Sequence, residues 1–197
     1  MSPLSFFRWI VILAALSALK TSDAQSGSIA ISRLSPAVRQ RLATPGFRVA
    51  VLFFALTDCP ISNRYVPVIE RLDREYASRG VQVWWVYPDP TDDARAIAQH
   101  RKDFAITGAI YPGAPRTAVD MAHVTVTPEA AVFVTQGDEL REVYHGRIDD
   151  RYIALGQERP RATRNELELA IEAALEGKPA PAPEGPPVGC SIEPAQK

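Results

Sequence analysis

Two apolar runs of strand length, with an amphipathic helix between them, limit this chain to few folds. Residues 48–56 (RVAVLFFAL) and 81–87 (VQVWWVY) are continuous, apolar and rich in Val and aromatic residues, which is typical of strands buried on both faces. Between them, residues 60–78 carry apolar side chains at helical spacing, and Gly80 marks the helix end. Because a strand–helix–strand unit makes its two strands parallel, the sequence predicts an α/β domain.

Shorter elements complete this prediction. We expect a helix over 36–42 and a short helix over 117–123, with strands over 129–135 and 140–145. Another helix is expected to run to about 104, with Thr91 as its cap and Asp92 and Asp93 in its first turn. A final helix over 163–176 is expected to begin with a Thr163–Glu166 capping box. The two late strands flank a turn at 136–139, which indicates an antiparallel hairpin. The order β-α-β-α-β-β-α therefore predicts a central mixed β-sheet flanked by helices.

The two ends of the chain differ in composition from the middle. Arg8, the apolar run 9–19 and the small residues around Ala24 are typical of a signal peptide over 1–24, with an uncleaved membrane anchor as the alternative. A domain over 25–177 follows. Residues 178–197 are rich in Pro and Ala and predict a semi-extended tail that carries Cys190. We therefore expect an exported, periplasmic or extracytoplasmic protein with no membrane contact after signal cleavage.

Charge and cysteine content exclude several classes. The 197 residues carry a formal net charge of −1, so a basic nucleic-acid groove is not expected. Only two cysteines are present, Cys59 and Cys190, too few for a disulfide scaffold or a four-cysteine zinc site.

Cys59 is the main candidate for chemistry, because it falls where the first buried strand meets the long helix. A thiol at a helix N-terminus faces unpaired N–H groups and the positive end of the helix dipole, and both lower its pKa. Arg64, one turn on, is expected to add to this effect, and Asp58 to oppose it. The alternative is an inert, space-filling cysteine.

Three features carry a resemblance to the thioredoxin superfamily over roughly residues 45–177. They are the tetrad Cys59-Pro60-Ile61-Ser62 at the strand-to-helix corner, Pro67 inside the helix, and Thr127-Pro128 before the third strand. Together with Val188-Gly189-Cys190-Ser191-Ile192, they resemble the redoxin, or alkyl hydroperoxide reductase/thiol-specific antioxidant-like, branch.

The resemblance implies a thioredoxin-like fold and an oxidoreductase with Cys59 as nucleophile. It also implies a cis peptide bond before Pro128, which leaves the Thr127 backbone free to pair with a partner. Pro60, Ser62 and Arg64 are then expected to contact the substrate. No cofactor and no metal site are implied, and the partners would be thiol or disulfide proteins and an external electron donor.

The departures from the family pattern matter as much. Ser62 stands where thioredoxins have a second cysteine, and Leu56 stands where the peroxidase members have threonine. A mixed disulfide on Cys59 therefore has no near neighbour to resolve it. We consider Cys190 as the resolving thiol, since a tethered thiol has a high effective concentration. The alternative is a tail cysteine with a separate role, such as contact with a partner.

Two other function classes stay open. One is a non-catalytic binding or assembly module that captures thiol proteins. The other is a copper(I)-handling protein that uses Cys59, Cys190 and His123. Among the remaining polar residues, we expect His100 on a solvated helix face and the paired acids Asp149 and Asp150 in solvent-exposed turns.

Overall fold

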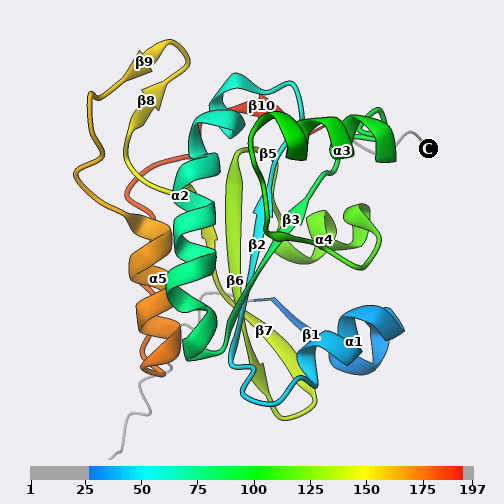
Figure 1. The fold of residues 1–197 in the computed structure, drawn as a ribbon. Coiled ribbons are helices and arrows are strands. Elements are labelled where there is room, and N and C mark those ends of the chain that lie inside the picture. Colours follow the sequence, from blue (N-terminus) through cyan, green and yellow to red (C-terminus); the bar gives the residue numbers. More distant parts are fainter. Residues whose placement is uncertain (1–26, 193–197) are drawn as a thin grey trace, which may run out of the picture.

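The computed structural model describes residues 27–192 (Figure 1). The predicted signal peptide over 1–24 lies outside the described residues. Between residues 27 and 192, no helix has both the length and the apolar character needed to cross a bilayer.

A central mixed sheet organises the molecule, as the sequence predicts. It has six strands in the order β1-β7-β6-β2-β3-β4. The strands are β1 (Ser28–Ala30), β2 (Val49–Phe54), β3 (Val81–Val86), β4 (Ala109–Ile110), β6 (Glu129–Gln136) and β7 (Glu139–Gly146). Strands β2, β3 and β4 are parallel, whereas β6, β7 and β1 add antiparallel pairs. This arrangement is that of a thioredoxin-like fold.

Helices cover both faces of the sheet. They are α1 (Pro36–Leu42), α2 (Pro60–Tyr76), α3 (Ala94–Asp103), α4 (Pro115–Ala122) and α5 (Glu166–Leu175), with short 3-10 turns at Ile31–Arg33 and Ala77–Arg79. On one face α2 and α5 lie side by side (Figure 1), and they close what we call the first core. On the other face α1 and α4 close the second core.

The buried strands explain why two cores form. Every residue of β2 is buried, so its alternate side chains enter opposite cores. In β3, Trp85 packs edge-on against Phe53 in the first core, with ring centroids 4.9 Å apart. Its neighbour Trp84 enters the second core, where it packs against Tyr111.

Two predicted helix caps are wrong. Thr91 does not open α3, because Asp93 is its N-cap and accepts from the Ala96 N–H at 2.8 Å. Asp92 bonds to Thr57 instead of lying in the first turn.

The Thr163–Glu166 capping box is also absent. Asn165 is the N-cap of α5, Thr163 bonds to Asp150, and Glu166 pairs with Arg147. At both helix starts, polar side chains that were expected in the cap or first turn bond instead to residues distant in the sequence.

The acidic pair was also predicted wrongly. Asp149 and Asp150 are buried rather than solvated. Asp149 accepts a hydrogen bond from the Tyr65 hydroxyl at 2.5 Å, and Asp150 accepts from Thr163 and Arg159. They hold the segment between β7 and α5 against the first core.

Several short strands were not predicted. A hairpin of β8 (Tyr152–Ala154) and β9 (Gln157–Glu158) projects beyond α2 and α5 (Figure 1). The C-terminal tail contains β10 (Cys190–Ser191), which pairs antiparallel with β5 (Val126–Thr127). The predicted semi-extended tail therefore returns to the domain and becomes part of its structure.

Candidate functional site

Cys59 lies at the corner between β2 and α2, as the sequence predicts. It is the N-cap residue of α2, and Pro60 occupies the first helical position, where its missing N–H costs nothing. The side chain is only 1% exposed. It is buried because the returning tail covers this corner.

The Thr127–Pro128 peptide bond faces the same corner. It is the cis bond that the resemblance implies. The Cys59 Sγ lies 3.6 Å from the Thr127 carbonyl oxygen. The loop before β6 thus forms one wall around the Cys59 sulfur.

The tail forms the opposite wall and brings the second cysteine to the first. In the β10–β5 pair, Cys190 is opposite Thr127, and the Ile192 N–H donates to the Thr125 carbonyl at 3.1 Å. The Cys190 Sγ lies 2.6 Å from the Cys59 Sγ, across 131 residues of sequence. The fold therefore places the two sulfurs in direct contact.

The pKa values of the two thiols shift in opposite directions. Burial raises the pKa of Cys59, but hydrogen bonds from the Cys190 thiol, from Ser62 and from the Ile61 N–H together hold it below its ordinary value. Burial and the neighbouring Cys59 raise the pKa of Cys190. Cys59 is therefore the more acidic thiol of the pair, and Cys190 the less acidic one.

Ser62 has a second property that fits this arrangement. Its side chain is buried, and its Oγ lacks a fixed oxygen or nitrogen partner among residues 27–192, so the hydroxyl is available to the Cys59 sulfur. A buried hydroxyl without a partner is costly. Donation to a Cys59 thiolate satisfies it.

A buried polar chain supports the loop that carries Cys59. Asp92 accepts from the N–H and hydroxyl of Thr57. Asn63 donates from Nδ2 to the Thr57 carbonyl at 3.4 Å. The Nε2 of His100 lies 2.8 Å from the Asn63 Oδ1, and its Nδ1 lies 3.0 Å from the Tyr87 hydroxyl. The Asn63 Oδ1 can only accept, so Nε2 carries a proton, and in the neutral imidazole Nδ1 then accepts from the Tyr87 hydroxyl.

The prediction that His100 is solvated is wrong, because its side chain is buried. The signal that could have revealed this is its helical spacing from Ile97 and Phe104, since Ile97 packs against the first core. The role of Gly189, which lets the tail approach β5, has no comparable sequence signal.

The predicted substrate-contacting residues divide into two groups. Pro60 and Ser62 flank Cys59 at the start of α2. Arg64 instead extends to the β8–β9 hairpin, where it pairs with Glu158 at 3.2 Å and is more than half exposed. Arg64 is not among the groups that shift the pKa of Cys59.

The third predicted copper ligand, His123, does not join the two cysteines. Within residues 27–192, no three or more His, Cys, Asp or Glu side chains are grouped so that they could hold a metal ion. His123 instead lies beside Glu142 and His145.

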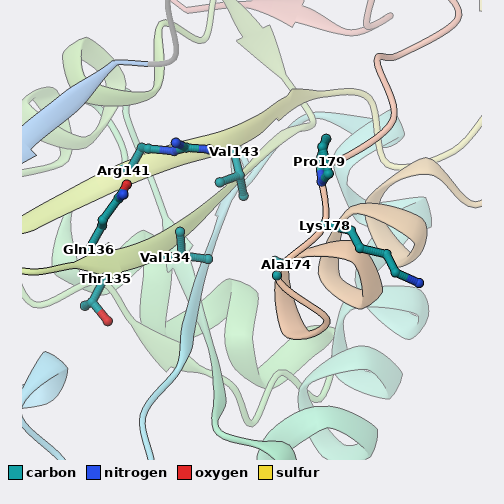
Figure 2. A pocket seen from close by; sticks show the side chains of 9 residues that line it. Val134, Thr135, Gln136, Arg141, Val143, Ala174, Lys178 and Pro179 are labelled. Atoms are coloured by element: carbon teal, nitrogen blue, oxygen red, sulfur yellow. The ribbon is translucent and has the colours of Figure 1, made fainter. Parts of the chain in front are cut away.

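A cavity lies at the end of the β6–β7 hairpin that is far from the cysteine pair. It has a volume of about 370 Å³ and is bordered by the turn end of the β6–β7 hairpin and the C-terminus of α5. Figure 2 shows Val134 and Val143 facing Ala174 and Pro179 across it. Pro128 immediately precedes the opposite end of β6, so this cavity is separate from the thiols.

Comparison with known proteins gives structural matches only. No family model matches the chain, and no curated protein matches it. An uncharacterised conserved protein from Geobacillus kaustophilus is similar in structure, with 22% identity, a TM-score of 0.61, and coverage of 76% of this chain and 79% of that one. A hypothetical protein from Sinorhizobium meliloti gives 21% identity, a TM-score of 0.63, and coverage of 79% and 82%.

A secreted Mycobacterium tuberculosis disulfide oxidoreductase is a more distant match. It gives 15% identity, a TM-score of 0.42, and coverage of 66% of this chain and 81% of that one. The matches to the Geobacillus kaustophilus and Sinorhizobium meliloti proteins, at 22% and 21% identity, support the fold alone.

Proposed function

We propose that this chain is an exported thiol-disulfide oxidoreductase of redoxin-like type, in which Cys59 and Cys190 form one reversible dithiol/disulfide couple. The observation that carries the proposal is the 2.6 Å separation of the two sulfur atoms. The sulfurs come from opposite ends of the domain, so only the complete fold brings them together. The Cys-Pro-Ile-Ser tetrad lacks a near second thiol, and Cys190 takes its place.

The opposite pKa shifts of the two thiols suit a thiol–disulfide exchange in which Cys59 reacts first and Cys190 second. The Cys59 thiolate attacks one sulfur of a partner disulfide, and the partner's other sulfur leaves as a thiolate. The Cys190 sulfur then attacks the Cys59 sulfur of the mixed disulfide, and its proton goes to the leaving partner thiolate. The partner disulfide gains two electrons and, with one further proton from solvent for the first leaving thiolate, becomes two thiols, while Cys59 and Cys190 become a disulfide. An external dithiol protein returns the couple to its reduced state.

The surroundings of Cys59 favour turnover over an inert cysteine. Thiolate character is the requirement for nucleophilic attack, and the groups around Cys59 lower its pKa. An oxidising compartment suits the same chemistry, and the apolar run at 9–19 is the basis for placing the protein there.

The first test is mass spectrometry of the full chain after equilibration with oxidised glutathione and alkylation of free thiols. We expect one intramolecular disulfide that links the peptides containing residues 59 and 190. Cys59→Ser and Cys190→Ser each remove this link and serve as matched controls. Two alkylated thiols in the wild type, or a disulfide only between molecules, would refute the couple.

Insulin reduction with dithiothreitol as electron donor tests turnover. We expect the wild type to exceed the uncatalysed rate and Cys59→Ser to equal it. Cys190→Ser should retain attack but accumulate mixed disulfides. If wild type and Cys59→Ser both stay at the background rate, the enzyme assignment fails and the binding-module alternative replaces it.

A further inference from the structure

The tail occupies the β5 edge in the manner of a bound peptide. Residues 190–191 form one antiparallel strand with Val126–Thr127, and this small sheet is separate from the central one. Addition of an extended segment to an exposed strand edge is a general mode of peptide recognition, in which main-chain hydrogen bonds give affinity and side-chain pockets give specificity. Here the chain supplies the segment itself.

Gly189 sets the closest contact in this arrangement. A Cβ atom at this position would lie 1.9 Å from the Thr127 carbonyl oxygen and 2.5 Å from its carbonyl carbon. It would also lie 3.0 Å from the Pro128 nitrogen. All three atoms belong to the backbone beside the Cys59 sulfur, so no side-chain rotation relieves the clash. Any strand that presents a sulfur here in the same way needs glycine immediately before its cysteine.

The residues after the cysteine differ in what they contact. The Ser191 side chain is exposed, so this position of a bound strand places little restriction on the residue type. Ile192 packs against the second core, and its N–H donates to Thr125. The β5 edge therefore fits the pattern Gly-Cys-x-apolar, read along a strand antiparallel to β5.

We infer that the β5 edge selects partner strands of this pattern, and that residues 189–192 are a built-in competitor that such a strand must displace before Cys59 can react. This inference rests on the proposed function, because it assumes that Cys59 attacks a partner disulfide. It adds the class of partner, an extended segment with a glycine before its disulfide-bonded cysteine. It also explains why a thiolate nucleophile is only 1% exposed at rest.

The test uses peptide disulfides and the full chain. The probe is an acetylated Pro-Val-Gly-Cys-Ser-Ile amide whose cysteine is disulfide-bonded to a chromogenic aromatic thiol, and a matched peptide has alanine in place of glycine. Attack by the Cys59 thiolate forms a mixed disulfide with the peptide and releases the aromatic thiolate, which is followed by absorbance. The protein is Cys190→Ser, so that Cys59 is the single thiol, with and without Gly189→Ala to weaken tail docking.

We expect the glycine peptide to react about tenfold faster than the alanine peptide with the double variant, because a backbone clash of this kind costs enough to lower affinity by that factor. We expect the glycine peptide to react faster with the double variant than with Cys190→Ser alone, because the tail no longer competes. Circular dichroism of both variants confirms that the fold is retained.

Equal rates for the two peptides would overturn the selectivity, and equal rates for the two protein variants would overturn competition by the tail. The small aromatic disulfide without a peptide separates these outcomes from a failure of the proposed function. If it reacts with Cys59 while the peptides show no preference, only this inference fails. If neither the peptides nor the small disulfide reacts, Cys59 is not a nucleophile and the proposed function fails as well.

Discussion

At the scale of single residues, the two sulfurs are chemically unequal although they are in contact. Cys59 is held at a helix N-terminus among hydrogen-bond donors, whereas Cys190 sits on a short strand with the Cys59 sulfur and the negative charge of Asp58 nearby. Both surroundings act in the same direction, since one stabilises a thiolate and the other disfavours a second one. The attacking and resolving roles therefore follow from position and not from residue type.

Ser62 gives a direct test of how the Cys59 thiolate is stabilised. Ser62→Ala removes a hydroxyl that lowers the Cys59 pKa. We expect the pKa to rise by about one pH unit, since a hydrogen bond to a charged group contributes about 1.5 kcal/mol. The pH dependence of iodoacetamide alkylation of the reduced protein measures this pKa. The control is Ser78→Ala, which makes the same change at an exposed position, and an equal pKa in both variants would exclude the role of Ser62.

Substitution of Asp150 tests the contribution of its ion pair with Arg159, which lies away from the thiols. Burial raises the pKa of this carboxyl, but hydrogen bonds from Thr163 and Arg164 and the charge of Arg159 outweigh it and lower the pKa to about 2. We expect Asp150→Asn to reduce the free energy of unfolding at neutral pH by about 1–2 kcal/mol.

The same carboxyl predicts a pH dependence. Because the pKa is lower in the folded than in the unfolded chain, this stability is complete above pH ~5 and is lost as the pH falls toward the folded pKa. Urea unfolding at several pH values measures the difference between wild type and variant, which should shrink with acidification. Asp138→Asn, at an exposed turn, is the control and should show no such trend.

At the scale of elements, the loop before α2 is held by side chains from α2 and from the segment that leads into α3. Asp92 holds Thr57, and His100 orients Asn63, whose side chain holds the Thr57 carbonyl. Asn63 also donates its N–H to the Cys59 carbonyl at 3.0 Å. The position of the nucleophile thus depends on α3, which contributes no atom to the thiol pair.

His100 provides the prediction at this scale. Burial lowers its pKa, although Asp92 and Asp103 oppose this. The unfolded chain then binds a proton more readily than the folded chain, so the wild type should lose stability as the pH falls below ~6.5. His100→Gln keeps a donor toward Asn63 but does not titrate, and should lose less stability over this range.

Urea unfolding of wild type and His100→Gln at a series of pH values makes the comparison. His145, whose pKa is raised by Glu142, titrates in both proteins, so its contribution cancels in the difference. Parallel pH profiles for the two proteins would contradict a neutral, buried His100.

The elements also show what the sequence can predict. The β-α-β unit and the late hairpin follow from apolar periodicity, because burial of one face imposes a period on the sequence. Strand β10 has no such period, since its pairing depends on the backbone of Thr127 and on the space that Gly189 leaves. Cys59 was predictable from its corner position, but the contact between Cys59 and Cys190 was only one of two open alternatives, because loop closure over such a distance leaves no local pattern.

At the scale of the whole molecule, the thiol pair connects the start of the first long helix to the C-terminal tail. The two cysteines are 131 residues apart, so their bond would enclose both cores. Upstream, the tail is held by Ala180 against the first core and by Glu184, whose N–H donates to Glu166. Residues 189–192 meet the domain through the two paired residues of β10, the Ile192 N–H and the apolar contact of Ile192. So few contacts make this end of the tail displaceable when the thiols are reduced, and a covalent bond would fix it in place.

This difference gives a prediction for the whole chain. A disulfide that closes a loop of this length lowers the conformational entropy of the unfolded state, by an amount that corresponds to about 4–5 kcal/mol for loops of 100 residues and more. We expect the oxidised protein to exceed the reduced protein in free energy of unfolding by about 2–5 kcal/mol, as judged by urea unfolding with and without a reductant. Cys190→Ser should show the same stability in both conditions.

The site of the bond makes the prediction specific. Limited proteolysis should cut the tail segment 178–189 in both redox states, but the C-terminal fragment should separate from the domain only after reduction. Fragment release without reductant, together with equal stabilities of the two states, would show that Cys190 does not bind Cys59 covalently. Retention under oxidation, with release on reduction, would show that the redox state of one sulfur pair determines whether the β5 edge is open to a partner.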